Sequence, residues 1–201
     1  MRGQVVLSLV VVIVVIMSVI GILLITTYNG IVKSEKAVEE AKAQIETVLQ
    51  RRLDLIPNLV ETVKGYAQHE REVLIAVTKA RGDAQDILQK IEKKKSLSKE
   101  DMQGLATSQS TLTKTLKTLF ALVENYPDLK ASTNFLALQD QLEGTENRIS
   151  VARQRYNYEV RIFNSKISTF PGVIIAPMFG FTEKASFEAK EEAGEPVKVK
   201  F

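Results

Sequence analysis

The chain has 201 residues, of which 45% are hydrophobic and 25% are charged, an ordinary globular mixture. It contains no cysteine, no tryptophan and a single histidine, which excludes disulfides and thiolate zinc sites and leaves few ways to build a metal site or a catalytic triad. Lysine and arginine number 27 against 24 aspartates and glutamates, so the near balance of charge gives no argument for nucleic acid binding.

Residues 5–25, "VVLSLVVVIVVIMSVIGILLI", form a run of 21 residues without a charged side chain. A helix of that length spans about 32 Å, and the hydrocarbon core of a bilayer is about 30 Å thick. The run is longer than the apolar part of a signal peptide and is not followed by a typical cleavage site. The sequence therefore predicts an uncleaved single-pass anchor in the cell membrane. Arg2 precedes this anchor whereas Lys33, Lys36 and Lys42 follow it, which favours a cytoplasmic location for the rest of the chain.

Apolar residues repeat at helical spacing after the anchor in two seven-residue series, Ile31, Val38, Ile45 and Ala41, Val48, Leu55. Pro57 follows, and proline has no N–H group and favours the first position of a helix. The sequence therefore predicts that one bundle helix ends before Pro57 and a second begins there, with Asp54 near its positive end. A single kinked helix is the alternative. Arg51, Arg52 and Asp54 are expected either to tie the two helix ends together or to hold an anionic partner.

The segment after Pro57 has the most regular apolar pattern, with spacings that alternate between four and three residues as in a coiled coil. Its members are Leu59, Val63, Tyr66, Glu70, Val73, Val77, Ala80, Ala84, Ile87 and Ile91. Glu70 is the one charged member, and a buried carboxylate needs a partner. We expect a basic residue of the last helix to pair with it, with Arg148, Arg153 and Arg155 as candidates. Such a pair either fixes helix register or belongs to a site inside the bundle.

Five lysines lie between Lys90 and Lys99, in a stretch typical of a polar turn. Ser98 and Asp101 form a capping-box pattern that begins a third helix. Its apolar stripe comprises Met102, Leu105, Gln109, Leu112, Leu116, Leu119, Val123 and Tyr126. Pro127 ends this helix. The stripe of a fourth helix comprises Phe135, Leu138, Leu142, Thr145, Ile149, Ala152, Tyr156, Val160, Phe163 and Ile167, and Pro171 ends it.

These elements predict an all-α protein, in which an N-terminal transmembrane helix is followed by an antiparallel up-down-up-down four-helix bundle. The predicted boundaries are an anchor over residues 1–27, a bundle over 28–170, and an apolar segment with a polar, disordered tail over 171–201. Because the helices alternate in direction, the lysine turn and the apolar segment are expected at the membrane end. The predicted membrane-proximal contacts are Lys93, Lys94, Lys95, Val173, Ile174, Ile175 and Phe179. Packing of the apolar segment on the bundle is the alternative.

No pattern in the chain predicts catalytic chemistry or a cofactor. His69 has no second histidine with which to share a zinc ion, and "SLSK" at 96–99 lacks the companion motifs of serine acyl-enzymes. The lysines of the turn have no aromatic neighbours for stacking single-stranded nucleic acid. Glu143 and Glu146 are interpreted as ion-pair partners of nearby arginines. The remaining candidates for a polar interior or an interaction site are Arg52, Asp54, Glu70, Glu146, Arg148 and Arg153.

Four blocks, "RRLDLIPNLVETVKGYAQHE", "YPDLKA", "LALQDQLEGTENRISVARQRYN" and "FPGVIIAPMFGFTEKASFEA", resemble the LemA family of bacterial membrane proteins in order and spacing. The resemblance covers residues 28–200 and departs from the family at Leu53 and at Gly172 and Val173. It implies a single N-terminal membrane helix, an antiparallel four-helix bundle, and little about activity, because the family has no established catalytic chemistry or general ligand.

The expected function is a non-enzymatic scaffold or interaction module at the bacterial cell membrane. Its expected partners are the lipid bilayer, through the N-terminal helix, and other membrane proteins; no cofactor and no nucleic acid are expected. An enzyme or a ligand-binding protein with a polar site around Glu70 inside the bundle is the alternative.

Overall fold

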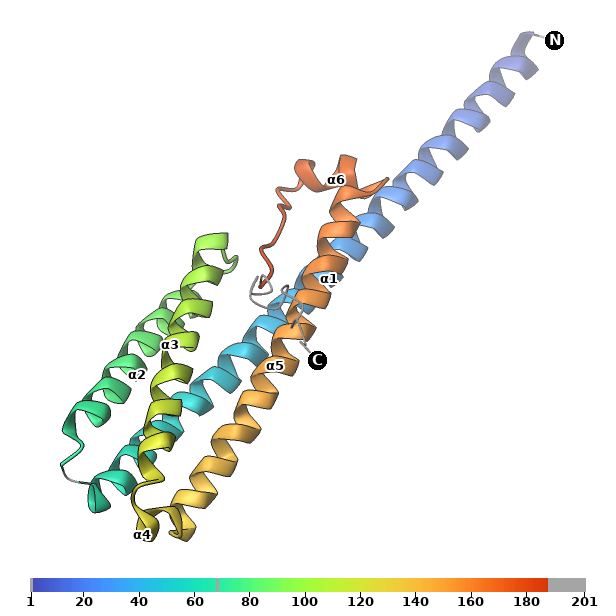
Figure 1. Cartoon of the computed structure of the whole chain (residues 1–201). Coiled ribbons are helices and arrows are strands. Elements are labelled where there is room, and N and C mark those ends of the chain that lie inside the picture. The colour runs from blue at the N-terminus through green and yellow to red at the C-terminus, as the bar shows by residue number, and fades with distance from the viewer. Residues whose placement is uncertain (1, 68, 188–201) are drawn as a thin grey trace, which may run out of the picture. The chain divides into compact units, whose positions relative to one another are not determined.

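The computed structural model describes residues 2–67 and 69–187, and this part of the chain contains helices and no strand (Figure 1). The helices are α1 (Arg2–Tyr66), α2 (Arg71–Glu92), α3 (Lys99–Val123), α4 (Pro127–Lys130), α5 (Thr133–Ser168) and α6 (Gly172–Met178). The prediction of an all-α protein is confirmed. The predicted polar end of the tail, from residue 188, lies outside the described residues.

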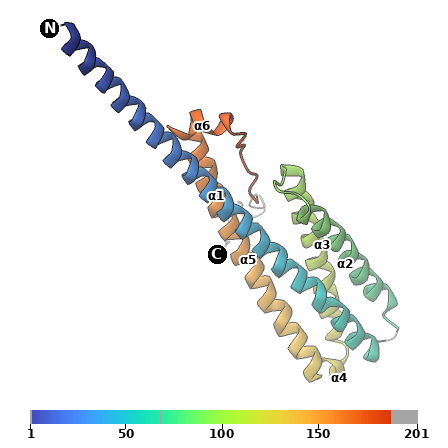
Figure 2. The same ribbon diagram turned by 180° about the vertical axis from the view of Figure 1, so that it is seen from behind.

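The chain divides into two compact units. The anchor unit comprises the chain up to Glu40 together with Tyr158–Lys184, and so contains the first part of α1, the end of α5 and α6. The bundle unit comprises Ala41–Asn157 and the chain from Ala185, and so contains the rest of α1, α2, α3, α4 and the first part of α5. Within the bundle unit, α2 and α3 lie side by side in both views (Figure 2).

α1 passes through Pro57 without a break, so the prediction that a new helix starts there is wrong. The second bundle helix is α2, which begins at Arg71 with Glu70 as its N-cap residue. Pro57 is exposed, so its ring displaces no core side chain. Asp54 therefore caps no helix, and its carboxylate accepts a hydrogen bond from Gln50 Nε2 at 2.7 Å.

The helix continues through Pro57 because a side chain satisfies the carbonyl group that proline leaves without a donor. In an α-helix the N–H of residue 57 would bind the carbonyl oxygen of residue 53, and proline has no N–H. Arg81 Nε, on α2, donates to that oxygen of Leu53 at 2.8 Å. The Leu53 side chain is fully buried and the hydrogen bond is part-buried, so Arg81 replaces the missing backbone donor at the edge of the core.

The buried face of α1 shifts by one residue relative to the predicted seven-residue series. The predicted positions that are buried are Ile31, Val38, Ala41 and Ile45. Further along, Leu55 is only half-buried and Ile56 is fully buried instead. A helix with 3.6 residues per turn drifts by about 20° per heptad from a 3.5-residue repeat. In α2 the predicted Val77, Ala80 and Ala84 are buried, and further along Leu88 is buried in place of Ile87.

The turn between α2 and α3 contains the predicted capping box. Ser98 Oγ accepts from the backbone N–H of Asp101 at 3.2 Å, and Asp101 Oδ2 accepts from the N–H of Ser98 at 3.0 Å. Lys94 Nζ lies 2.7 Å from the same carboxylate. The hydrogen bonds from Lys94 and from the Ser98 backbone lower the pKa of Asp101. The stripe of α3 is buried from Met102 to Val123 as predicted.

The unbroken α1 predicts an energetic coupling between residues 57 and 81. Arg81→Met removes the donor to the Leu53 carbonyl and should lower the free energy of unfolding by about 1–3 kcal/mol. Pro57→Ala restores a backbone N–H for that carbonyl, so Arg81→Met should cost clearly less in this background. Denaturant unfolding of the full chain in detergent measures both values. Equal costs in the two backgrounds would contradict this explanation.

The capping box predicts an acid-sensitive component of stability at Asp101. A carboxyl group whose pKa is lower in the folded chain stabilises it above the unfolded pKa, and this stabilisation is lost as pH falls through the folded pKa. Asp101→Asn should cost about 1 kcal/mol at neutral pH, by analogy with cap substitutions. The difference between the variant and the parent chain should shrink below about pH 4. Unfolding curves at several pH values test this, and a difference independent of pH would argue against it.

Candidate functional site: the groove around Arg52

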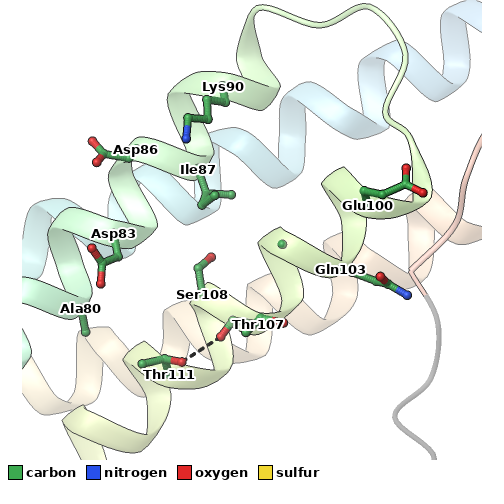
Figure 3. Close-up of a pocket in the computed structure, with 11 residues that line it drawn as sticks. Ala80, Asp83, Asp86, Ile87, Lys90, Glu100, Gln103, Thr107, Ser108 and Thr111 are labelled. Atoms are coloured by element: carbon green, nitrogen blue, oxygen red, sulfur yellow. Dashed lines mark hydrogen bonds between the residues drawn. The ribbon is translucent and has the colours of Figure 1, made fainter.

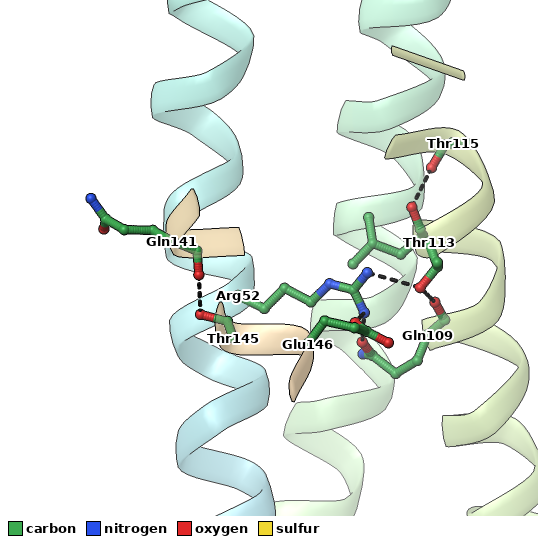
Figure 4. Close-up of polar contacts among 8 residues, drawn as sticks. Arg52, Gln109, Thr113, Thr115, Gln141, Thr145 and Glu146 are labelled. Carbon is green, nitrogen blue, oxygen red and sulfur yellow. Dashed lines mark hydrogen bonds and ion pairs between the residues drawn. The ribbon is translucent and has the colours of Figure 1, made fainter. Parts of the chain in front are cut away.

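Arg52, on α1, is a buried cation with partners on two other helices of the bundle unit. Its relative exposure is 4%. Its Nη2 donates to Thr113 Oγ1 at 2.8 Å and its Nη1 to Gln109 Oε1 at 3.3 Å, both on α3. The same Nη1 lies 3.0 Å from Glu146 Oε2 on α5. Figure 4 shows these four side chains converging, so one guanidinium joins three helices.

The positive charge of the buried Arg52 guanidinium is only partly balanced by its surroundings. Burial lowers the pKa of its guanidinium, Glu146 raises that pKa, and neighbouring Arg153 lowers it again. An arginine remains charged in a protein, so the bundle holds this cation inside with one carboxylate as counter-ion. The side chain of Glu146 is 51% exposed, so water screens the counter-ion more than it screens the cation.

Two buried donors in the same place have no hydrogen-bond partner within the described part of the chain. They are Gln109 Nε2 and Arg153 Nε. Gln109 is only 2% exposed, and buried polar groups are normally paired. Burial also lowers the pKa of Arg153, and Glu146 raises it. The site therefore has more hydrogen-bond donors than its own residues use.

The C-terminal segment supplies one wall of this site. Asn157, on α5, donates from Nδ2 to the carbonyl oxygen of Phe187 at 3.0 Å and accepts from the N–H of Phe187 at 2.8 Å. The hydroxyl of Tyr156 donates to the carbonyl oxygen of Ala185 at 3.0 Å, and burial raises the pKa of Tyr156 to about 12. The Phe187 ring therefore has a fixed place, where the Arg153 guanidinium lies 5.3 Å from its centroid.

These residues line an open groove of about 680 Å³ between α1, α3 and α5. Its charged lining residues are Arg52, Lys114, Lys117 and Arg153 against Glu146, a net charge of +3 from four basic residues and one acidic residue. Serine, threonine, asparagine and glutamine side chains, the Phe187 ring, Ala106 and Ile149 complete the lining. An anionic group fits this set, because guanidinium and hydroxyl donors bind carboxylate and phosphate oxygens.

A second groove, of about 600 Å³, lies between α2 and α3 (Figure 3). Its charged residues are Asp83, Asp86, Lys90 and Glu100, and all four are exposed. The labelled side chains do not converge on one point in the picture, and the one hydrogen bond drawn joins Thr111 to the backbone of Thr107. No group of three or more metal-ligating side chains occurs among the described residues. Within the described residues this groove therefore offers no set of metal ligands.

The structure brings together three of the six polar candidates, Arg52, Glu146 and Arg153. Asp54 and Arg148 line a different groove on the bundle unit, and Arg148 is exposed. The prediction that Glu70 pairs with an arginine of the last helix is wrong. Within the described residues its polar partner is Tyr126, whose hydroxyl donates to Glu70 Oε1 at 2.9 Å. This contact joins the start of α2 to the start of α4.

Sequence reasoning missed the α3 and C-terminal parts of the site. Gln109 is the one polar member of the α3 stripe between Met102 and Val123, which was a usable signal for a polar layer in the core. Nothing in the sequence pointed to Asn157 and Phe187, because their contact joins residues 30 positions apart. Of the predicted membrane-proximal residues, Ile175 is buried, whereas Val173, Ile174 and Phe179 are exposed.

The LemA family model matches residues 41–201, which include every residue of the groove. Protein LemA of Metamycoplasma hominis is 26% identical over 163 residues, which cover 81% of this chain and 69% of that protein. Magnetosome protein MamQ 2 of Paramagnetospirillum magneticum and Magnetosome protein MamQ of Magnetospirillum gryphiswaldense are 24% and 23% identical over 188 residues. Each of these two matches covers 87% of this chain and 69% of the relative.

The buried charge of Arg52 predicts that removing its counter-ion Glu146 costs more stability than replacing Arg52 and Gln109 together by apolar side chains. Glu146→Leu leaves a buried guanidinium without its counter-ion and should lower the free energy of unfolding by about 2 kcal/mol. The double variant Arg52→Met with Gln109→Leu replaces the layer by apolar side chains and should be near neutral or stabilising. Thermal or denaturant unfolding in detergent compares them. A double variant as unstable as Glu146→Leu would mean that the layer is required for folding.

Proposed function

The chain belongs to the LemA family, and we propose that it acts at the bacterial cell membrane as a non-enzymatic scaffold that holds other membrane proteins through its groove. One helix, α1, carries the apolar run and also contributes Arg52 to the groove. The N-terminal part of α1 is long and apolar enough to cross a membrane, and none of its most apolar stretch is buried. The lysines that follow this stretch favour the cytoplasmic side for the bundle unit.

The observation that carries the proposal is the surplus of donors and positive charge in the groove around Arg52. Four basic side chains face one carboxylate, and Gln109 Nε2 and Arg153 Nε have no partner among the described residues. An acidic segment of a partner protein would supply carboxylates to these donors and would neutralise the surplus charge. The Phe187 ring offers an apolar contact beside them.

A small anionic ligand in the same groove is the second candidate function. The same unused donors suit the carboxylate or phosphate group of such a ligand as well as they suit an acidic side chain. The alternative site around Glu70 has less support, because Tyr126, the N-cap residue of α4, donates to Glu70, the N-cap residue of α2. The two candidates share one prediction about charge and differ in the size of the bound species.

The acidic-partner proposal predicts charge-dependent crosslinking at the groove. A photoreactive amino acid at Ser150, which lines the groove, should capture a membrane protein in intact cells. The variant Lys114→Glu with Lys117→Glu should reduce that product several-fold, because both lysines line the groove and are exposed. The matched control, Lys79→Glu with Lys90→Glu, changes exposed lysines of α2. Immunoblotting and mass spectrometry identify the product.

The outcomes separate the candidates. A captured protein with an acidic segment at the crosslink supports the scaffold. A product that responds equally to both charge reversals would contradict a role for the groove. Loss of the product, together with binding of a small anion to the purified full chain that depends on Lys114 and Lys117, would favour the second candidate.

A further inference from the structure

The segment around α6 exposes an unusual amount of apolar surface. Residues 168–182 contain no charged side chain. Within this stretch the exposed large apolar side chains are Phe170, Val173, Ile174, Met178 and Phe179, with relative exposures of 80%, 49%, 54%, 69% and 57%. Neighbouring Ile175 and Ala176 are buried at 1% and 3%. α6 therefore has apolar residues on both faces, and its own unit covers only one of them.

The exposed surface lies beside the point where α1 leaves its apolar run. The ring of Phe179 is 4.6 Å from that of Tyr28, and the ring of Phe181 is 5.9 Å from it. Tyr28 follows Ile25, the last residue of the run, by three positions, which is about 5 Å along a helix. Lys166 Nζ also donates to the carbonyl oxygen of Gly30 at 3.1 Å. These contacts all lie within the anchor unit.

α6 is held firmly in this position. A Cβ atom on Gly172 would lie 1.9 Å from the carbonyl oxygen of Lys166, so α6 packs on the end of α5 at a distance that only glycine allows. The chain reverses after α6 at Gly180, with φ of +75°, and the N–H of Phe181 returns to the carbonyl oxygen of Ala176 at 3.0 Å. The exposed residues are therefore a fixed surface.

Charged groups of the anchor unit lie past Tyr28 along α1, where Lys166 already reaches Gly30. Lys184 Nζ lies 2.7 Å from Glu35 Oε1. Asn164 fixes Lys184 by donating to its carbonyl oxygen at 2.9 Å and accepting from its N–H at 2.9 Å. Glu35 follows Tyr28 by seven residues, or about 10 Å along a helix. The apolar surface thus meets the end of the membrane segment, and the ion pair lies on the aqueous side of it.

We propose that α6 and its flanking phenylalanines form a second membrane contact, which lies in the interfacial layer of the bilayer beside the anchor. The surface continues the apolar surface of α1, and the layer into which interfacial elements insert is about 5–10 Å deep. Tyr28 and the phenylalanines have the aromatic character common at that depth. The segment does not span, because the 7 residues of α6 rise only about 10 Å, against about 30 Å for the hydrocarbon core of a bilayer. The contact sets how deep the anchor unit lies in the bilayer. It also sets how this unit is rotated about the axis of α1.

Site-directed spin labelling of the full chain tests this contact, and the absence of cysteine allows single labels without background. Ile174→Cys and Met178→Cys place the label on the exposed surface. Ile75→Cys and Val151→Cys are matched controls, because these side chains are 63% and 65% exposed and belong to the bundle unit. The labelled chain is reconstituted into vesicles of phosphatidylcholine and phosphatidylglycerol. The measurement compares collision with oxygen, which concentrates in lipid, and with a water-soluble nickel chelate.

The labels at 174 and 178 should collide with oxygen several-fold more than with the chelate, and the control labels should show the reverse. In a Val173→Ser, Ile174→Ser background the label at 178 should move toward the aqueous pattern, while circular dichroism stays unchanged. Labels at 174 and 178 that behave like the controls would overturn the proposal. So would labels protected from both reagents, because that result indicates a protein, such as a second copy of the chain, on the surface.

Discussion

The carbonyl oxygen of Leu53 is the constraint on which the bundle unit depends. Pro57 deprives it of the backbone donor that every neighbouring carbonyl in α1 has, and Arg81 replaces that donor from α2. Without the replacement, the helix would have to end before Pro57 or leave a polar atom unpaired beside the core. The contact keeps α1 unbroken to Tyr66. It also sets the register of α2 against α1. One turn further along α2, Gln85 Nε2 donates to Gln50 Oε1 at 3.2 Å in the same register.

The polar layer at Arg52 lies one residue before this constraint, and it follows a different logic. Buried ion pairs are often no more stabilising than apolar residues of similar size, and here the pairing is incomplete. A bundle selected for stability alone has no use for buried donors such as Gln109 Nε2 and Arg153 Nε, which have no partner within residues 2–67 and 69–187. Functional sites are where proteins depart from such rules. The same helix thus has a feature that secures its continuity and, beside it, the surplus of donors on which the proposed function rests.

The sequence predicted the elements that depend on local chemistry. The capping box at Ser98 and the stripe of α3 are present, because each involves residues within a few turns of one another. The predicted stop at Pro127 is displaced: α3 already ends at Val123, and Pro127 is the first residue of α4. The site was only partly predictable. Arg52, Glu146 and Arg153 could be named as candidates for a polar or ion-paired site, but their mutual contacts could not. Glu70 was assigned an arginine and has a tyrosine instead, because charge alone does not tell which helix end lies nearest.

By itself the sequence determined that the chain is all-helical, carries one apolar run of membrane length and belongs to one family. The amino-acid composition, the helical spacing of apolar residues and the order of the four family-like sequence blocks are sufficient for these conclusions. Only the tertiary structure decided whether Pro57 breaks α1, which residues surround Arg52, and which side chains of α6 are exposed. Each of these depends on a contact between residues distant in the chain: Arg81 with Leu53, Asn157 with Phe187, Tyr28 with Phe179. Local propensity is a weak guide wherever such a contact supplies or removes a hydrogen-bond partner.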